Sequence, residues 1–373
     1  MAYLAVQFIA LRFETVKVEP GRSWLSQVVH NWVQWDGLVY ATIANFGYPI
    51  VEDPTFKSLD SAYPVWPPGY PIVVRLASYV LPGDVAVAAL VVSNVAALGM
   101  LVVLYRLVDH ELGAGSAERT LLMFIAFPTA FYLATAYSES LFLLLTFAAL
   151  YCARRGHWWA AGLLAGASSA TRVLGVTICV AFAYEYLRQR EFRWRRIRLN
   201  VLGIALAPLG LMLYMAFLWW RFDNPMLFRD AQAHWGRGGM YMPWTTIAHS
   251  LRYLNPARHP YAGVINLLDI ATCLLGLAFL VLCFVGPWRL RRDQLYLVLA
   301  GALPFIIAVL QPTSIDGGTP MQSMNRYALT FFPMFLVMAQ MARNRFVEKF
   351  VVFAGLPLQV GLLILYLTGD WAG

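Results

Sequence analysis

The chain contains several apolar segments that are long enough to cross a lipid bilayer as helices. The cleanest of them, Val85–Val108, exceeds the roughly 20 residues that a membrane-spanning helix requires. Sixty per cent of the 373 residues are hydrophobic and only 13% are charged, whereas a soluble protein has about 25% charged residues. The pattern therefore predicts an all-α polytopic membrane protein.

Basic residues gather in five clusters between the apolar segments, which together hold 16 of the 28 Lys and Arg residues. The clusters are Arg106–Arg119, Arg154–Arg155, Arg188–Arg198, Arg289–Arg292 and Arg343–Lys349. Cytoplasmic loops are rich in Lys and Arg, so we place all five clusters in the cytoplasm. Because the basic residues follow the membrane topology in this way, the net charge of +8 does not indicate a nucleic-acid partner. The order of apolar segments and basic clusters predicts a single domain, residues 1–373, with about eleven spans. It also predicts two large extracytoplasmic segments, residues 14–83 and 221–260.

Two intervals between clusters, Arg119–Arg154 and Arg155–Arg188, are short for a helical hairpin that crosses and returns. Each allows two legs of about 16 residues, or about 24 Å, against a hydrocarbon core of about 30 Å. The tip of each hairpin should therefore lie near the outer boundary. One lone charge falls near each tip, Glu139 in the first hairpin and Arg172 in the second.

Charged side chains within membrane segments are costly and mark candidate functional sites. Arg172 suits an anionic group, because a guanidinium forms paired hydrogen bonds with phosphate. The alternative is a structural pair between Arg172 and Glu139 inside the bundle. Arg326, at the outer end of another predicted span, is a second phosphate candidate, with interfacial snorkelling as its alternative. For Asp269, in a span near its outer end, we expect a role in helix packing.

Asp36 is a lone acid on the apolar face of a predicted amphipathic helix in the first external segment. At 3.6 residues per turn it shares this face with Leu25, Val29, Trp32, Val39 and Ile43. One interpretation is a helix cap or an ion pair at the membrane surface. The other is a general base, because an apolar setting disfavours the charged carboxylate and raises its basicity.

The sequence offers little for a metal or a nucleotide. It has no P-loop or GxGxxG, and none of its six histidines has metal-ligand spacing. Glu52 and Asp53 are either metal ligands or a solvated loop pair, and two carboxylates alone make a poor divalent-ion site. We expect no cofactor and metal-independent activity. Four cysteines in apolar runs are expected to be buried thiols: Cys152, Cys179, Cys273 and Cys283.

Five segments between about Trp32 and Pro333 carry a family pattern. They read WVQWDGLVYATIANFGYP, YPVWPPGYPIVVRL, FPTAFYLATAYSESLFLLLTFAALYCARRGHWWAAGLLAGASSATRVLGV, FRDAQAHWGR and MNRYALTFFPMFL. The most specific piece is AYSES, followed about 30 residues later by SATR and Gly175. These segments resemble the PIG-V family, which contains GPI mannosyltransferase 2 and bacterial relatives. The chain departs from the family in its short first apolar run and in YPVWPP, around Tyr63–Pro68.

The resemblance implies a GT-C glycosyltransferase fold with a helical first extracytoplasmic loop. It also implies a lipid-linked donor, a polyprenyl-phosphate sugar that is typically mannose, and inversion of the anomeric centre on the extracytoplasmic side. The family's base, an acid in the first external loop, falls on Asp36. Other recurrent positions fall on Tyr137, Ser138, Glu139, Arg172, Gln232, Trp235 and Arg237.

We therefore predict a mannosyltransferase with Asp36 as the catalytic base. Donor phosphate would bind Arg172, Arg326 and Arg237. The substrates would contact Trp35, Tyr137, Glu139, Gln232 and Trp235. The predicted partners are polyprenyl-phosphate mannose, a lipid or glycan acceptor and membrane lipids.

Two alternatives stay open. One is a GT-C transferase of another sugar or onto protein, and the other is a transporter or flippase for a lipid-linked sugar. A transporter should place its charges near the membrane midplane in paired repeats, whereas these charges lie toward one face. The excess of Arg over Lys suggests a GC-rich bacterial genome, so we expect a multi-pass protein of a bacterial plasma membrane.

Overall fold

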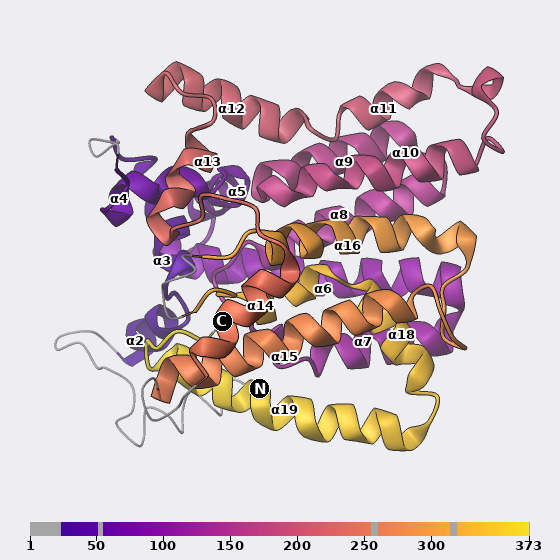
Figure 1. Cartoon of the computed structure of the whole chain (residues 1–373). Coiled ribbons are helices and arrows are strands. Elements are labelled where there is room, and N and C mark those ends of the chain that lie inside the picture. Colours follow the sequence, from indigo (N-terminus) through magenta and orange to yellow (C-terminus); the bar gives the residue numbers. More distant parts are fainter. Residues whose placement is uncertain (1–23, 51–54, 255–259, 314–318, 373) are drawn as a thin grey trace.

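The computed structural model describes residues 24–50, 55–254, 260–313 and 319–372, and the regular secondary structure in these ranges is helical. Four short helices gather at one end of the molecule (Figure 1): α2 (Trp24–Asn31), α3 (Asp36–Phe46), α4 (Leu59–Ala62) and α5 (Gly69–Ser78). The bundle follows, with α6 (Val85–Leu112), α7 (Ala114–Ile125), α8 (Glu139–Arg154), α9 (Trp158–Thr171), α10 (Ile178–Arg188), α11 (Leu202–Ala205), α12 (Leu209–Phe222), α13 (Leu227–Asp230), α14 (Pro243–Arg252), α15 (Pro260–Leu282), α16 (Leu295–Leu310), α17 (Met324–Tyr327), α18 (Pro333–Met341) and α19 (Arg345–Leu367). Short 3-10 helices connect them: η1 (Tyr63–Val65), η2 (Ala130–Leu133), η3 (Val173–Thr177), η4 (Trp194–Arg196), η5 (Leu199–Val201), η6 (Ala231–Trp235), η7 (Arg292–Gln294) and η8 (Ala328–Thr330).

Within the described ranges, 4 helices are long and apolar enough to cross a membrane, namely α6, α15, α16 and α19. The segments Leu199–Ala205 and Leu209–Phe222, bent by 49° at their break, would together make a fifth span. The all-α polytopic membrane fold is thus confirmed. The hairpin helices are short, with 16 residues in α8 and 14 in α9. The figure of about eleven spans stays a prediction, because its remaining crossings depend on such short helices.

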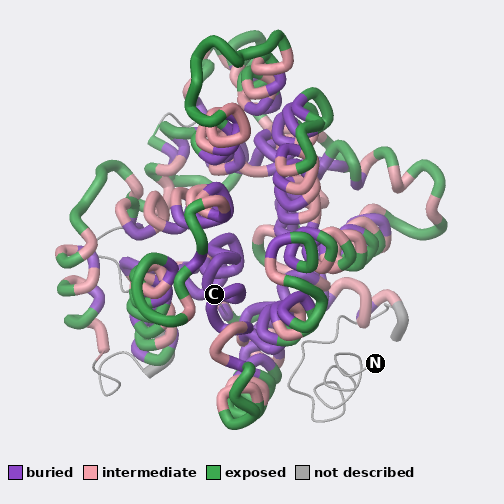
Figure 2. The backbone as a smooth tube through the Cα atoms, turned by 90° about the vertical axis from the view of Figure 1, so that its right-hand side faces the viewer, coloured by how far each residue is buried: buried purple, intermediate pink, exposed green. Residues whose placement is uncertain are grey.

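Small residues let α9 lie directly against α11 and α12. A Cβ atom added to Gly162 would lie 1.9 Å from the Gly203 carbonyl oxygen, and one added to Gly210 would lie 2.0 Å from that of Gly166. Side chains at these positions would force the backbones apart, so the glycines permit the close approach common between membrane helices. Figure 2 shows the buried residues on the inner faces of the helices.

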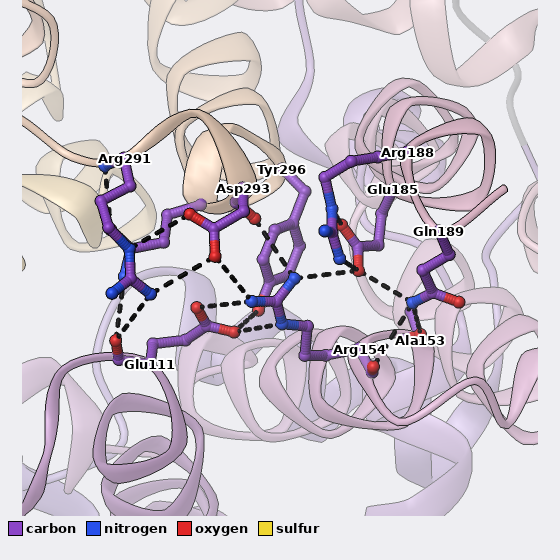
Figure 3. Close-up of polar contacts among 10 residues, drawn as sticks. Glu111, Ala153, Arg154, Glu185, Arg188, Gln189, Arg291, Asp293 and Tyr296 are labelled. Atoms are coloured by element: carbon purple, nitrogen blue, oxygen red, sulfur yellow. Dashed lines mark hydrogen bonds and ion pairs between the residues drawn. The ribbon is translucent and has the colours of Figure 1, made fainter. Parts of the chain in front are cut away.

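The basic loops meet at the end of the bundle opposite α2–α5 (Figure 1). Arg154 joins three of the elements there, as Figure 3 shows. Its Nε lies 2.6 Å from a carboxylate oxygen of Glu111 in α6, and its Nη1 lies 3.3 Å from one of Glu185 in α10. Its Nη2 lies 3.1 Å from Asp293 in η7. The clusters that the sequence places on one side of the membrane therefore share one end of the fold.

The predicted continuous helical face from Leu25 to Ile43 is wrong, because α2 ends at Asn31 and α3 begins at Asp36. Trp35, between the two helices, has a φ of 51°, which breaks a right-handed helix. Besides local turn bonds, the intervening backbone bonds to distant segments. The Trp32 carbonyl accepts from Ala136 N at 3.3 Å, and Gln34 N donates to the Tyr366 hydroxyl at 3.1 Å.

Candidate active site

A cavity of about 410 Å³ opens among α3, η3, η6, α16 and α17. It touches α16 at Ile307 and Ala308, near the end of that helix remote from Asp293 and the basic loops. Six of the nine predicted site residues line it: Asp36, Arg172, Gln232, Trp235, Arg237 and Arg326. The structure thus brings together side chains that are nearly 300 positions apart in the sequence.

The other three predicted residues lie outside the lining. Trp35 is half exposed and packs edge-to-face on Trp371, with ring centroids 5.3 Å apart. Tyr137 is fully buried, and the guanidinium carbon of Arg326 lies 5.3 Å from its ring centroid. Glu139, the first residue of α8, is buried behind the two arginines that it contacts. Because Tyr137 and Glu139 are buried behind the lining residues, they support the cavity wall and are not exposed to a substrate in the cavity.

Four charged side chains form a continuous chain along the cavity wall. Arg326 Nη1 lies 2.8 Å from Asp36 Oδ2, and Arg326 Nε lies 3.3 Å from Glu139 Oε1. Arg172 Nη1 in turn lies 2.5 Å from Glu139 Oε1. Asp36 is the most accessible of the four, with 20% of its side chain exposed, against 6% for Arg326 and 3% for Glu139. The ion-pair alternatives for Asp36 and Glu139 are therefore present, yet three of the four side chains also face the cavity.

The turn that carries Arg326 is held from three directions. Asp269 Oδ1, on α15, accepts a hydrogen bond from Asn325 N at 3.0 Å. Thr129 Oγ1 donates to the Asn325 carbonyl at 2.7 Å, and Asn325 Nδ2 donates to the Ala372 carbonyl at 3.4 Å. Arg326 is itself only 5% exposed, so interfacial snorkelling is not its role. Asp269 joins two helices, as expected of a packing residue, and in doing so fixes the backbone next to Arg326.

Glycines bring the backbone around Arg172 into close contact with its neighbours. A Cβ atom on Gly69 would lie 2.6 Å from the Ala170 carbonyl, so α5 packs directly against the end of α9. Gly175 N donates to the Arg172 carbonyl at 2.8 Å, which turns the chain from α9 into η3. The side chain of Arg172 then points toward Glu139, with its guanidinium carbon 5.7 Å from the Tyr327 ring centroid.

A third arginine reaches the cavity from the segment after η6. Arg237 Nη1 donates to the Tyr327 hydroxyl at 3.3 Å, and its Nη2 donates to the Gln322 carbonyl at 3.4 Å. Arg229 also lines the cavity, and Asp36 is the one acid among the described lining residues. Four guanidinium groups against one carboxylate, with Glu139 behind them, make the cavity suited to an anionic group such as phosphate.

Sequence reasoning missed several aromatic residues in this wall, among them Tyr40 and Trp371. Tyr40, one turn after Asp36, lines the cavity, and its hydroxyl lies 2.8 Å from the Ser138 hydroxyl. The helical spacing from Asp36 could have indicated it. Trp371 also lines the cavity, and the Arg326 guanidinium carbon lies 5.7 Å from its ring. No local pattern could have indicated Trp371, because only the return of the chain after α19 brings it there.

No group of three or more His, Cys, Asp or Glu side chains that could hold a metal ion occurs in the part of the chain that the structure describes. The proposed pair Glu52 and Asp53 lies outside that part, as does the first apolar run. The cysteines are free thiols, with Cys273 and Cys283 buried as predicted. The prediction of burial is wrong for Cys152 and Cys179, which are only half-buried.

More than half of the chain matches a known protein family. Residues 16–220 match the family model for mannosyltransferase (PIG-V). GPI mannosyltransferase 2 of Yarrowia lipolytica is 29% identical over 143 residues, which cover 35% of this chain and 39% of that protein. The protein of the same name from Cryptococcus neoformans is 31% identical over 129 residues, covering 32% of this chain and 28% of its own length. The chain thus matches well under half the length of these relatives.

The fold can be compared with a solved structure, that of ArnT from Cupriavidus metallidurans bound to undecaprenyl phosphate. The two align with a TM-score of 0.50 and 16% identity, over 92% of this chain and 59% of ArnT. At this identity the likeness concerns the fold alone, and it agrees with the GT-C-type helical fold that the family resemblance implies. Because the family model matches more than half of its residues, the chain belongs to the PIG-V mannosyltransferase family.

Proposed function

We propose that the chain is an inverting mannosyltransferase that uses polyprenyl-phosphate mannose and acts on the extracytoplasmic side of a bacterial plasma membrane. The acceptor would be a hydroxyl group of a lipid or glycan. One observation carries the proposal: among the lining residues that the structure describes, one carboxylate, Asp36, shares the cavity with Arg172, Arg237 and Arg326. Membership of a mannosyltransferase family supports mannose as the sugar.

In this proposal Asp36 acts as the general base. Arg326 pairs with Oδ2, which leaves Oδ1 to accept a proton from the acceptor. As the acceptor oxygen attacks the anomeric carbon, its proton passes to the Asp36 carboxylate. Trp371 and Tyr40 line the cavity near this acid and offer aromatic surfaces for a sugar ring.

The arginines would hold the leaving group. The bond between the anomeric carbon and the phosphate oxygen breaks as the new glycosidic bond forms, and its electron pair stays on the phosphate. Preorganised guanidinium groups stabilise this growing negative charge without reorganising during the step. Attack from the face opposite the phosphate inverts the anomeric centre, so one acid and one anion site suffice.

A lipid-linked donor fits the position of the cavity at helix ends. A polyprenyl tail must stay within the bilayer, so its phosphate would lie at the membrane surface, the depth that we propose for Arg172, which follows the last residue of α9. ArnT, which has the same fold, is described with bound undecaprenyl phosphate, and this supports a polyprenyl phosphate as the carrier here. The sequence also has no motif for a nucleotide sugar.

Replacement of Asp36 tests the base. We expect Asp36→Asn to lower kcat by about 10² to 10⁴, because general-base catalysis contributes about that factor. Asp60→Asn is the matched control, since Asp60 is an exposed acid in α4 of the same segment and should keep wild-type activity. The assay is transfer of radiolabelled mannose by the purified protein. If Asp36→Asn retains activity within about tenfold of wild type, Asp36 is not the base.

We also propose that transfer needs no divalent ion, because the arginines supply the positive charge that a metal would bring. Activity should survive dialysis against EDTA. The measurement compares transfer rates before and after EDTA and after Mn²⁺ or Mg²⁺ is returned. Loss on chelation with recovery on metal addition would contradict the proposal and direct attention to Glu52 and Asp53.

A further inference from the structure

A second cavity, of about 610 Å³, lies at the end of the bundle that holds the basic loops. It is bordered by Arg289, Arg291 and Arg292 and by Tyr184 of α10. Its apolar lining consists of Cys283, Phe284, Leu290, Leu295 and Val298. The same helix, α16, borders the candidate active site near Gln311 and this cavity at Leu295. These positions are about 24 Å apart along the helix, so the two cavities lie toward opposite membrane faces.

Of the three arginines at this cavity, Arg291 pairs with Asp293, whereas Arg289 and Arg292 have no acidic partner in the described part of the chain. The lining residues that the structure describes include no acidic side chain. The nearest acid, Asp293, is shared between Arg291, at 3.1 Å, and Arg154, also at 3.1 Å (Figure 3). Arg289 and Arg292 are exposed, and their side chains make no ion pair or hydrogen bond with the part of the chain that the structure describes.

The loop that presents these arginines is fixed in place. Leu290 N donates to the Cys283 carbonyl at 2.9 Å, which closes the loop after α15. The Tyr184 hydroxyl donates to the Arg292 carbonyl at 2.7 Å, and Gln340 Nε2 donates to the Trp288 carbonyl at 3.2 Å. Helices α10 and α18 therefore hold the backbone of this loop in position before any ligand arrives, so that binding has only the arginine side chains to order.

An apolar surface adjoins the charged rim. Phe284 borders the cavity and is 54% exposed, and its neighbour Val285 is 56% exposed. A free anion such as inorganic phosphate has no apolar part that could contact this surface. A phospholipid has both a phosphate, which the arginines can bind, and acyl chains, which can pack on the apolar side chains. Basic pockets between transmembrane helices at this membrane face are suited to anionic headgroups. We propose that this cavity binds the headgroup of an anionic glycerophospholipid, independently of the transferase activity.

The test measures lipid binding to the purified full chain by native mass spectrometry. Phosphatidylglycerol and phosphatidylcholine are titrated separately, with glycerol 1-phosphate as a headgroup without chains. Arg289→Ala/Arg292→Ala removes the two unpaired arginines. Arg195→Ala/Arg198→Ala, in the exposed loop after α10, removes the same charge elsewhere on the same end. Because all four side chains are exposed, the thermal midpoints of both double variants should match the wild type.

We expect the wild type to bind phosphatidylglycerol in preference to phosphatidylcholine. Arg289→Ala/Arg292→Ala should weaken phosphatidylglycerol binding about 25-fold, since each arginine near a membrane surface contributes about a factor of five. The control pair should leave it unchanged. Equal weakening by both pairs would mean diffuse attraction and overturn the site. If glycerol 1-phosphate competes as well as phosphatidylglycerol does, the ligand is not a phospholipid. If the wild type shows no preference between the two lipids, both the site and its proposed occupant are contradicted.

Discussion

Glu139 is the residue on which the two deepest arginines of the active-site cavity depend. Its Oε1 lies within 3.3 Å of Arg326 Nε and 2.5 Å of Arg172 Nη1, and its side chain is almost completely buried. Without that carboxylate, two buried guanidinium groups would face each other with only Asp36 to balance them. We therefore regard Glu139 as a positioning residue, which holds both arginines toward the proposed phosphate site.

This interpretation gives a stability prediction. Glu139→Gln should lower the free energy of unfolding by about 3–5 kcal/mol, the usual cost of removing one partner from a buried ion pair. Thermal unfolding in detergent, followed by tryptophan fluorescence, measures the effect. Glu191→Gln is the control, because Glu191 also pairs with an arginine but does so in solvent. Its hydrogen bond with Arg196 lowers the pKa of the Glu191 carboxyl, yet both side chains are exposed. That variant should melt like the wild type, and equal melting of both variants would contradict a structural role for Glu139.

At the residue level the sequence singled out charges that share one cavity, but it did not indicate their partners. Asp36, Arg172 and Arg326 stand out because charges are rare in apolar surroundings, and each lines the cavity. The pairing of Arg326 with Asp36 could not be predicted, since 290 positions separate them. The contribution of Trp371 was hidden for the same reason, because tertiary contacts alone bring it to the wall.

Among the elements, α9 links the close packing of the helices to the position of Arg172 in the candidate site. Its Gly162 touches the backbone of Gly203, and its last residue, Thr171, precedes Arg172. A side chain at Gly162 would therefore move both the helix and the arginine. The short hairpin containing α9 followed from the spacing of basic residues, whereas the break between α2 and α3 did not, because Trp35 adopts its left-handed conformation within a tertiary setting.

We predict that Gly162→Ala lowers the free energy of unfolding by about 1–3 kcal/mol, the usual cost of overpacking. The added Cβ would lie 1.9 Å from the Gly203 carbonyl oxygen. The matched control is Gly361→Ala in α19, where a Cβ meets nothing within 4 Å and alanine should be neutral or stabilising. Thermal midpoints of the two variants give the comparison. A Gly162→Ala protein as stable as Gly361→Ala would mean that α9 and α11 separate at no cost.

At the scale of the whole molecule, two features divide the bundle into two ends. Arg154 gathers α6, α8, α10 and η7 around the basic loops, while α3 and α17 close the acid-containing cavity at the other end. This polarity was predictable, because the positive-inside pattern depends on charge counts along the sequence rather than on contacts. The shape of the cavity was not, since it arises where the chain returns after α16 and α19 to meet α3.

The central claim is transfer from a lipid-linked donor, and the choice of donor tests it most directly. Purified protein receives either polyprenyl-phosphate mannose or GDP-mannose, each with the same crude lipid acceptor extract. The measurement is the amount of radiolabelled mannose in the acceptor after a fixed time. We predict transfer from polyprenyl-phosphate mannose and none from GDP-mannose. Transfer from GDP-mannose with no lipid intermediate present would contradict the account.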